Sequence, residues 1–414
     1  MKYLGELCQV SGKRWRRTGE PSLNGDVRCA WDLRHALLDF IADFANWDAS
    51  NVPEFLGAAR AITAAAHLST GGVSGTRPLV VDPFAGGGAI PLEAARIGAD
   101  TFASDLNPIP VLLNKVTLEY VPRYGRRLAD AVRAAGERIK NAAELEVGRF
   151  YPKENRCETP VAWLWARTIH CEGPGCGVEL PLIRSCWLAQ RGGRSVRLRL
   201  LPDPRRKYIG FEITDGSKSI SGDGTASGGS ATCPLCGYTT SNPKLRAQLA
   251  VRHGGARSSR LFAVAVTNAG EVGRRYRLPT SRDLAAVKDA EEELQRLQAD
   301  GAHSLNVIPD ELIPTERPSP NARGLSAVTR MGVTTFGDLF ATRPALTLST
   351  LARLVSSEAT TTRDTADPGF QDAVALCLAL AVDRLADSLS SLATWASNGE
   401  LIRSTFARQA LSIA

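Results

Sequence analysis

The chain has 414 residues, 43% of them hydrophobic and 22% charged, and its formal net charge is +7. This composition is that of a globular protein of two or three domains, and it excludes a wholly disordered chain. No uninterrupted apolar run reaches the ~18 residues that cross a bilayer, and residues 1–17 lack the apolar core of a signal peptide. We therefore expect a cytoplasmic protein that does not enter membranes.

The N-terminal part of the sequence predicts helices followed by an alternation of strand and helix. Residues 30–68 carry apolar side chains at helical spacing on both sides of a turn region, 48–53, which indicates two packed helices. A Gly- and Ser-rich linker, 69–78, comes next. The alternation then consists of strand 79–81, helix 90–97, strand 100–104 and helix 111–120.

Beyond residue 120 the alternation stops. Residues 126–146 have a helical pattern, whereas 161–278 mixes short β-like runs with turns and includes a low-complexity segment, 217–230, that we expect to be a loop. Helical patterns return in a charged segment, 283–298, and in an apolar stretch, 374–395, whose charged residues favour a buried helix over a membrane span. We divide the chain into an N-terminal helical segment (1–70), a Rossmann-like part (71–150), a β-rich insertion (151–280) and a helical region (281–414).

A glycine-rich bend follows the first predicted strand. The run Asp-Pro-Phe-Ala-Gly-Gly-Gly at 82–88 joins strand to helix, and its glycines lack the side chains that would keep a ligand away from the backbone. Asp105 closes the second strand near the roughly 20-residue offset at which an acidic side chain binds both hydroxyls of a ribose. The loop has neither the Gly-Lys-Ser/Thr of a Walker loop nor the Gly-x-Gly-x-x-Gly spacing of dinucleotide binders. Loop and acid together predict a nucleoside site, whereas the loop alone would also suit a plain strand-to-helix turn.

Four of the nine cysteines form two close pairs. Four residues separate Cys171 from Cys176, and two separate Cys233 from Cys236. In a reducing compartment such pairs more often hold a metal than form disulfides, and four thiolates satisfy the tetrahedral preference of structural zinc. We therefore expect a closed, structural zinc site, the alternative being unliganded surface thiols. Ordinary free thiols account for the other five cysteines, Cys8, Cys29, Cys157, Cys186 and Cys377.

Positive charge is concentrated in one segment. Residues 184–277 contain 17 Lys and Arg against 5 Asp and Glu, a net charge of +12, whereas the rest of the chain has −5. This basic segment overlaps the region of the two cysteine pairs. A zinc-stabilised fold there would hold the arginines in place for contacts with phosphate groups. The alternative is a solvated basic face.

Several strings accompany the loop and the cysteine pairs. They are Asp-Pro-Phe-Ala-Gly-Gly-Gly-Ala-Ile-Pro-Leu-Glu-Ala at 82–94, Ser-Asp-Leu-Asn-Pro at 104–108, Asn-Lys at 114–115, Trp-Leu-Trp-Ala-Arg-Thr at 163–168, Arg-Tyr-Arg at 275–277 and Ala-Val-Asp-Arg-Leu-Ala-Asp at 381–387. Together with the cysteines, they resemble the adenine-specific DNA methylases that contain a zinc ribbon. The likeness covers most of residues 79–410.

The resemblance implies an α/β fold with a partial Rossmann-like methyltransferase sheet, a zinc-ribbon β insertion with a basic surface, and a helical C-terminal region. It implies S-adenosylmethionine and structural zinc as cofactors and DNA as the partner. Asp105 would take the ribose, and Asn107 would border the adenine pocket. The residues implied to bind S-adenosylmethionine are Asp82, Pro83, Phe84, Ala85, Gly86, Gly87, Gly88, Asp105, Leu106 and Asn107. Those implied to bind zinc are Cys171, Cys176, Cys233 and Cys236.

The sequence lacks the motif that carries the chemistry in such enzymes, so its catalytic residues are unknown. Amino methylation uses Asp or Asn followed by Pro-Pro and an aromatic residue, which together bind the target amine and stack on the flipped base. The nearest strings, Asp-Pro-Gly-Phe at 367–370 and Asn-Pro-Ile-Pro at 107–110, each lack part of it. In the resembling family the motif lies beyond the position where this chain ends. We expect either a split subunit that receives its missing strands from a second chain, or a truncated and inactive product.

The leading expectation is thus an S-adenosylmethionine-dependent adenine-N6 DNA methyltransferase, or the cofactor-binding and DNA-contacting portion of one. The alternative is a zinc-ribbon nucleic-acid-binding protein whose cofactor site is vestigial and which has no catalytic activity. Methylation of cytosine N4 or of RNA stays open, because base identity is set by residues that this sequence does not contain. No motif indicates a target sequence or an oligomeric state.

Overall fold

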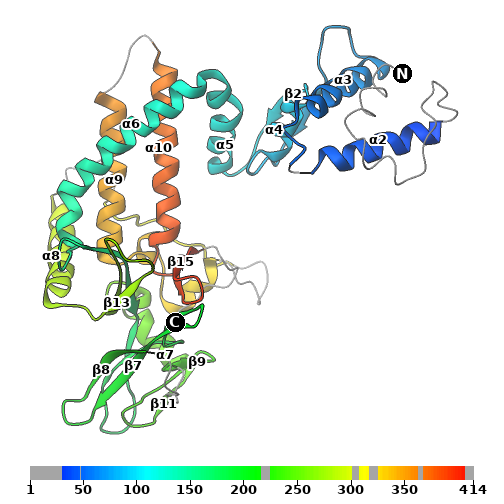
Figure 1. Cartoon of the computed structure of the whole chain (residues 1–414). Coiled ribbons are helices and arrows are strands. Elements are labelled where there is room, and N and C mark those ends of the chain that lie inside the picture. Colours follow the sequence, from blue (N-terminus) through cyan, green and yellow to red (C-terminus); the bar gives the residue numbers. More distant parts are fainter. Residues whose placement is uncertain are drawn as a thin grey trace. The chain divides into compact units, whose positions relative to one another are not determined.

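The computed structural model describes residues 30–46, 48–215, 224–300, 307–316, 325–361 and 367–405. These residues belong to two compact units, Met1–Asp130 and Ala131–Ala414, and each unit is considered by itself (Figure 1). Cys8, Cys29 and the chain end at 406–414 lie outside the described residues. Within the described ranges, no helix combines the length and the apolar character that crossing a bilayer requires.

The first two helices pack through an aromatic cluster. α2 (Ala30–Phe44) and α3 (Pro53–Ser69) confirm the helical pair expected from the apolar spacing, and the proline that starts α3 favours helix initiation there. The rings of Phe40, Phe44 and Phe55 stack with centroids 5.7–6.3 Å apart. Because stacked rings remove a large apolar area from water, this cluster joins the two helices.

A βαβ unit comes next in the chain. β1 (Leu79–Asp82), α4 (Ala89–Arg96) and β2 (Asp100–Ala103) confirm the predicted strand, helix and strand, and the two strands pair in parallel. The register matches the last residues of both strands, so the glycine bend after β1 and Asp105 after β2 lie at the same edge of the sheet. In the part of the chain that the structure describes, this parallel sheet has two strands, and no Rossmann sheet is formed.

Within the first unit, one face of this small sheet is not covered by any described element. α4 packs on the sheet, while Leu79, Val81 and Phe102, which share one face by strand alternation and register, are each more than half exposed. Parallel sheets in proteins are usually buried on both faces. The βαβ unit therefore presents an apolar surface of the kind that helices or further strands cover.

The helix after β2 changes its geometry midway. α5 (Pro108–Asn114) is α-helical, whereas η2 (Lys115–Tyr120) is a π-helix, so the predicted helix 111–120 is regular only in its first part. The side chain of Asn107 caps α5 by accepting the N–H of Ile109 at 3.0 Å. π-helical turns are rare in proteins and frequently occur at functional sites.

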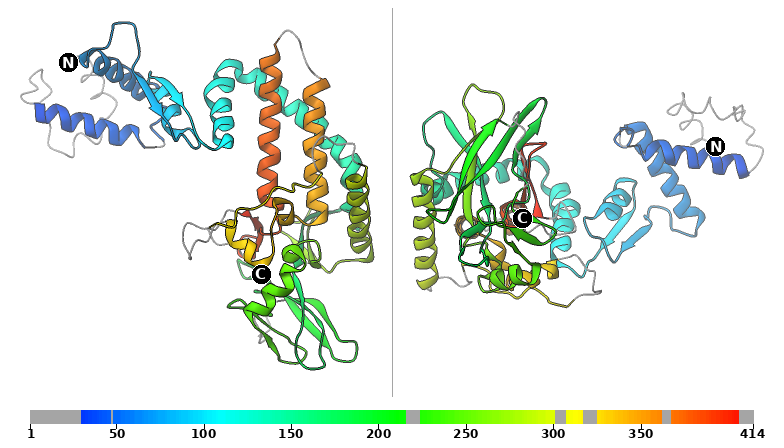
Figure 2. Two further views of the ribbon diagram at one scale, coloured as in Figure 1. Left: turned by 180° about the vertical axis from the view of Figure 1, so that it is seen from behind. Right: turned by 90° about the horizontal axis from the view of Figure 1, so that it is seen from below.

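Long helices form one part of the second unit. α8 (Ser281–Ala299), α9 (Thr342–Thr361) and α10 (Pro368–Leu389) accompany the C-terminal half of α6 (Val121–Val147). α9 and α10 run side by side, as Figure 1 and the left view of Figure 2 show. Apolar side chains from α6, α8 and α9 share one buried cluster, which contains Val147, Ala290, Leu294, Ala345 and Leu346.

The C-terminal apolar stretch is not one helix. We expected helix through residue 395, but α10 ends at Leu389, where the N–H of Ser391 bonds to the carbonyl of Leu339 and turns the chain. The residues beyond form a hairpin, β14 (Thr394–Ala396) and β15 (Leu401–Arg403). A contact distant in sequence thus ends a helix that apolar spacing alone would continue.

Small antiparallel sheets form the other part of the second unit (Figure 1). Two three-stranded sheets pack against each other and bury Leu164, Leu198, Ala263 and Ala265. One consists of β3 (Glu158–Ala166), β12 (Arg260–Asn268) and β13 (Arg275–Arg277), the other of β6 (Trp187–Arg191), β7 (Arg194–Asp203) and β8 (Tyr208–Asp215). The smaller elements are β4 (Thr168–His170), β5 (Glu179–Pro181), β9 (Ala226–Ser227), β10 (Ser230–Thr232), β11 (Thr239–Thr240), α7 (Asn242–Ala250), η3 (Gly148–Phe150), η4 (His253–Gly255), η5 (Leu325–Met331) and η6 (Phe336–Leu339).

The predicted low-complexity loop is partly ordered. Residues 216–223 lie outside the described residues, but β9 falls within the segment that we expected to be a loop throughout, and β10 begins at its last residue, Ser230. The N–H groups of Thr225 and Ala226 both bond to the carbonyl of Ile183, which anchors β9 to a distant part of the chain. The chain is therefore a mixed α/β protein with small sheets and a helical C-terminal part.

Candidate metal centre and glycine loop

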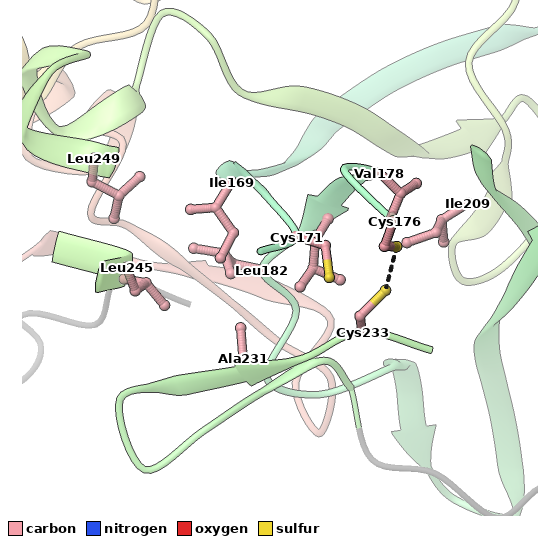
Figure 3. Packing of buried hydrophobic residues seen from close by; sticks show 11 residues of the cluster. Ile169, Cys171, Cys176, Val178, Leu182, Ile209, Ala231, Cys233, Leu245 and Leu249 are labelled. Atoms are coloured by element: carbon pink, nitrogen blue, oxygen red, sulfur yellow. Dashed lines mark hydrogen bonds between the residues drawn. The ribbon is translucent and has the colours of Figure 1, made fainter. Parts of the chain in front are cut away.

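Two hairpins bring the four paired cysteines together. Cys171 directly follows β4 and Cys176 lies in the turn before β5, whereas Cys233 directly follows β10 and Cys236 lies in the turn before β11. The Sγ atoms of all four lie within 4.8 Å of one another. Figure 3 displays Cys176 and Cys233, from the two different hairpins, facing each other.

The sulfur positions fit a zinc ion. The Sγ atoms of Cys171 and Cys236 are 3.5 Å apart, and those of Cys176 and Cys233 are 3.9 Å apart. At a Zn–S bond length of about 2.3 Å, the edges of a sulfur tetrahedron are roughly 3.8 Å long. Four thiolates complete this coordination, so the site has the donor set of a closed, structural centre.

The backbone around the cysteines adopts tight turns. Gly175, Gly177 and Gly237 have positive φ, a conformation that glycine adopts without strain, and the N–H of Gly237 bonds to the carbonyl of Cys233 at 2.8 Å. The N–H of Gly173 lies 3.4 Å from Sγ of Cys171 and donates to it. Such N–H groups stabilise sulfur that carries negative charge.

Burial disfavours the charged thiolate form of two of these cysteines when no metal is bound. Desolvation raises the pKa of the Cys171 and Cys233 thiols, whereas the N–H of Tyr238 lowers the pKa of Cys236. A bound dication would offset the desolvation of the thiolates, because metal and sulfur then neutralise each other.

An apolar shell surrounds three of the four cysteines, whereas Cys236 is exposed. Ile169, Val178, Leu180, Ile209 and Leu249 are each almost fully buried, and they belong to the same core cluster as Cys171, Cys176 and Cys233 (Figure 3). This shell is contributed by the β4–β5 hairpin and by β8 and α7, which come later in the sequence. Three of the four cysteines are thus part of the core of this small β region, and the fourth, Cys236, is exposed.

The glycine loop, residues 82–88, closes on the end of β2. The N–H of Gly86 donates to Oδ2 of Asp105 at 3.0 Å, and the N–H of Ala85 donates to the carbonyl of Ser104 at 2.9 Å. Oδ1 of Asp105 accepts the N–H of Asn107 at 2.9 Å. These backbone hydrogen bonds, from Asn107 first and then Gly86, hold the pKa of the Asp105 carboxyl below its usual value, so the group is ionised at neutral pH.

The loop backbone is open to a ligand. Gly86 and Gly88 have positive φ, 50° and 80°, and a Cβ built on Gly86 or Gly87 would meet no atom of the described chain within 4 Å. Phe84 in the loop and Leu106 directly after Asp105 are 84% and 97% exposed. An ionised carboxylate, an accessible backbone and two exposed apolar side chains therefore lie at one edge of the βαβ unit.

The other predicted loop residues have local roles. Oδ1 of Asp82 accepts the N–H of Phe84 at 3.2 Å, and Ala85 is buried beneath the bend. Pro83 lies between them in the turn. Asn107 has its side-chain oxygen engaged as the cap of α5, so its amide group alone would face a ligand.

Sequence reasoning missed the contribution of Asn114 to this loop. Its Nδ2 donates to the carbonyls of Gly86 at 3.0 Å and Pro110 at 2.7 Å, and its buried Oδ1 has no hydrogen-bond partner among the described residues. That oxygen would lie 2.2 Å from a Cβ on Gly88. Asn114 therefore ties α5 to the loop. A polar side chain in a predicted apolar helix was the available signal, but its partner is 28 residues away.

No family model, curated protein or solved structure matches this chain. Of the motifs that resemble the zinc-ribbon DNA methylases, the four-cysteine cluster is the one that the geometry supports directly. Its chemistry is that of a structural zinc site.

The proline-containing strings that we considered for catalysis have structural roles. Oδ1 of Asp367 accepts the N–H of Phe370 at 3.2 Å and caps α10, with Pro368 at the first helical position. Asn107 and Pro108 do the same for α5. Both strings are therefore helix starts.

Proposed function

We propose that this chain is the cofactor-binding and DNA-contacting portion of an S-adenosylmethionine-dependent adenine-N6 DNA methyltransferase, built around a structural zinc. The observation that carries the proposal is the position of Asp105, whose carboxylate meets the N–H of Gly86 at the carboxyl ends of two adjacent parallel strands. In open α/β sheets this edge is where nucleotides bind.

The residues of this edge suit the parts of the cofactor. The carboxylate of Asp105 has acceptor capacity left for ribose hydroxyls, since each of its oxygens accepts one backbone N–H and can accept a further hydrogen bond. Phe84 and Leu106 offer apolar surface for a purine ring. Gly86 and Gly87 leave space for the methionine portion to approach the backbone. When bound, S-adenosylmethionine supplies an electrophilic methyl group.

The exposed face of the βαβ unit supports a second chain as partner. Leu79, Val81 and Phe102 would be covered if further strands and helices packed on this face. We propose that a partner polypeptide supplies them, together with the residues that bind the target base. The apolar face would then be part of an interface.

Binding of S-adenosylmethionine to the purified chain tests the proposal by titration calorimetry. Asp105→Ala is expected to weaken binding by on the order of tenfold or more, because it removes charge-assisted hydrogen bonds to the ribose. Asp100→Ala is the matched control, since Asp100 lies at the start of the same strand and its carboxylate forms an exposed ion pair with Arg77. Equal affinity of the Asp105→Ala variant and the parent chain would contradict the proposal.

Gly88→Ala is expected to damage the same site through the fold. The new Cβ would lie 2.2 Å from Oδ1 of Asn114, and φ at position 88 is +80°, so the loop must move. We expect weaker cofactor binding and a lower melting temperature. Gly57→Ala in α3, where a Cβ meets no described atom within 4 Å, should instead leave binding unchanged. A Gly88→Ala variant with parental binding and melting would show that the loop tolerates a side chain there.

The alternative function, a zinc-held nucleic-acid-binding protein without catalysis, is favoured by a contact between the metal centre and the basic segment. Nζ of Lys207, in the turn between β7 and β8, donates to the carbonyl of Gly175 at 2.8 Å, beside Cys176. The metal centre therefore positions a basic turn. Binding of DNA without measurable affinity for S-adenosylmethionine would favour this alternative.

A further inference from the structure

Two hairpin turns meet at a pocket away from the metal centre. The pocket has a volume of about 650 Å³ and lies between Arg194, the first residue of β7, and the turn and strand formed by Glu271, Val272, Arg274, Arg275 and Tyr276. We call these six residues the arginine groove. The two turns are joined directly, because a guanidinium nitrogen of Arg194 donates to the backbone carbonyl of Arg274.

Acidic neighbours orient the guanidinium groups of the groove. Arg194 bonds to Glu400 at 3.3 Å, and Arg275 pairs with Glu271 at 2.6 Å. The side chains of Arg194 and Arg275 nevertheless remain 42% and 64% exposed. Each guanidinium carries five N–H donors, so one carboxylate leaves donors available for another oxyanion.

Aromatic side chains form a fixed base beside these arginines. The guanidinium of Arg274 lies over the ring of Trp395 at 5.4 Å. Nε1 of Trp395 and the hydroxyl of Tyr276 both donate to the carbonyl of Leu188, at 2.7 and 2.8 Å. Since hydrogen bonds to the backbone lock both aromatic side chains, binding here would cost little ordering of the groove.

We propose that the arginine groove binds the phosphodiester backbone of double-stranded DNA. The groove offers three guanidinium groups from two turns, more than one small anion would bind at once. The planar N–H groups of a guanidinium also match the spacing of phosphate oxygens. The groove lies within the segment of net charge +12, whose field attracts a polyanion. The almost fully exposed Val272 at the tip offers an apolar contact to deoxyribose. This inference rests on the proposed function, for which it supplies the DNA-contacting surface.

Fluorescence anisotropy with a labelled DNA duplex tests the groove without cofactor. A duplex of about 20 base pairs and arbitrary sequence suffices, since it offers many phosphates to the protein. The Arg274→Gln, Arg275→Gln double variant is expected to bind on the order of tenfold more weakly at about 0.1 M salt, with the slope of log K against log salt reduced by about 2, since each phosphate contact contributes about 0.9. Unchanged affinity and slope would overturn the proposal.

Matched variants separate a specific groove from general positive charge. Arg282→Gln, Lys288→Gln removes the same charge from exposed positions on α8 and is expected to change affinity less than about twofold. Glu271→Gln removes the groove's own carboxylate and should tighten binding, a gain that misfolding cannot produce. Equal losses in the two double variants, or tighter binding of a duplex RNA than of the DNA, would overturn the assignment.

Failure of this inference can be distinguished from failure of the proposed function. Calorimetry with S-adenosylmethionine reports on the loop around Asp105, which the groove variants leave unchanged. If DNA binding depends on the groove arginines but the chain does not bind S-adenosylmethionine, the groove is supported as a DNA-binding surface and the methyltransferase proposal is rejected. If the chain binds S-adenosylmethionine but its DNA affinity does not depend on Arg274 and Arg275, the proposed function is supported and the groove is rejected as the DNA-binding surface.

Discussion

Removal of zinc is expected to unfold the region from β4 to α7. Three of the four cysteines belong to one core cluster with the buried side chains of Ile169, Leu180 and Leu249, so loss of the ion removes the bonds that hold this core together. Structural zinc sites contribute apparent binding free energies of about 10–16 kcal/mol at neutral pH, as large as the whole stability of a typical domain, about 5–15 kcal/mol. We expect one zinc per chain by elemental analysis and loss of β-type circular dichroism on chelation.

Single substitutions give the same result without a chelator. Cys233→Ser, at a fully buried position, should yield protein with little bound zinc and a much lower melting temperature. Cys157→Ser is the control, because Cys157 is exposed and lies outside the cluster. Retention of cooperative unfolding and of the parental melting temperature in metal-free protein would reject a structural role for zinc.

Lowering the pH is expected to release zinc and destabilise the protein, as chelation does. Zinc binds thiolates, and protons compete with the metal for sulfur, so the stability that the metal contributes falls as pH decreases. Buried Cys171 and Cys233 accentuate this competition, because desolvation raises the pKa of both thiols. Zinc release measured with a chromogenic chelator should therefore increase as pH is lowered.

The parts of the fold that the sequence predicted depend on local chemistry. The βαβ unit is encoded by a short apolar run, a glycine bend and an acid at the end of the next strand, all within residues 79–105. The cysteine cluster could be predicted because the two cysteine pairs supply all four zinc ligands, whatever sequence lies between them. The spacing of the cysteines did not predict that each pair lies on its own hairpin, β4–β5 or β10–β11.

The parts that the sequence did not predict depend on distant contacts. β9 forms in a Ser- and Gly-rich segment because its backbone bonds to Ile183, about 40 residues earlier. α10 ends where Ser391 bonds to Leu339, which no local helix signal marks. Arg194 and Arg274 are 80 residues apart in the chain, so the total charge of the segment could be counted but the groove could not be located.

Asp283→Ala is expected to destabilise the second unit by about 3–5 kcal/mol, the usual cost of removing one partner of a buried ion pair. The Asp283 carboxylate is fully buried at the start of α8, where it bonds to the guanidinium of Arg277 and accepts the N–H of Thr280 at 2.9 Å. Arg277 also bonds to Glu158 at 3.0 Å. Without Asp283, the largely buried guanidinium of Arg277 loses one of its two carboxylate partners, and α8 loses its capping box. Urea denaturation at neutral pH measures the effect.

The pH dependence of stability identifies the ionised carboxylate as the cause. Burial alone would raise the pKa of Asp283, but hydrogen bonds from Arg277 and Thr280 hold it below its usual value. A depressed folded-state pKa contributes stability that is complete above the unfolded value of about 3.9 and is lost as pH falls through the folded value. The difference between parent and Asp283→Ala should therefore shrink in acid. Asp289→Ala, exposed on the same helix, should cost less than about 0.5 kcal/mol at either pH. If both variants lose the same stability, or if the Asp283 effect is independent of pH, the network does not anchor α8 by charge.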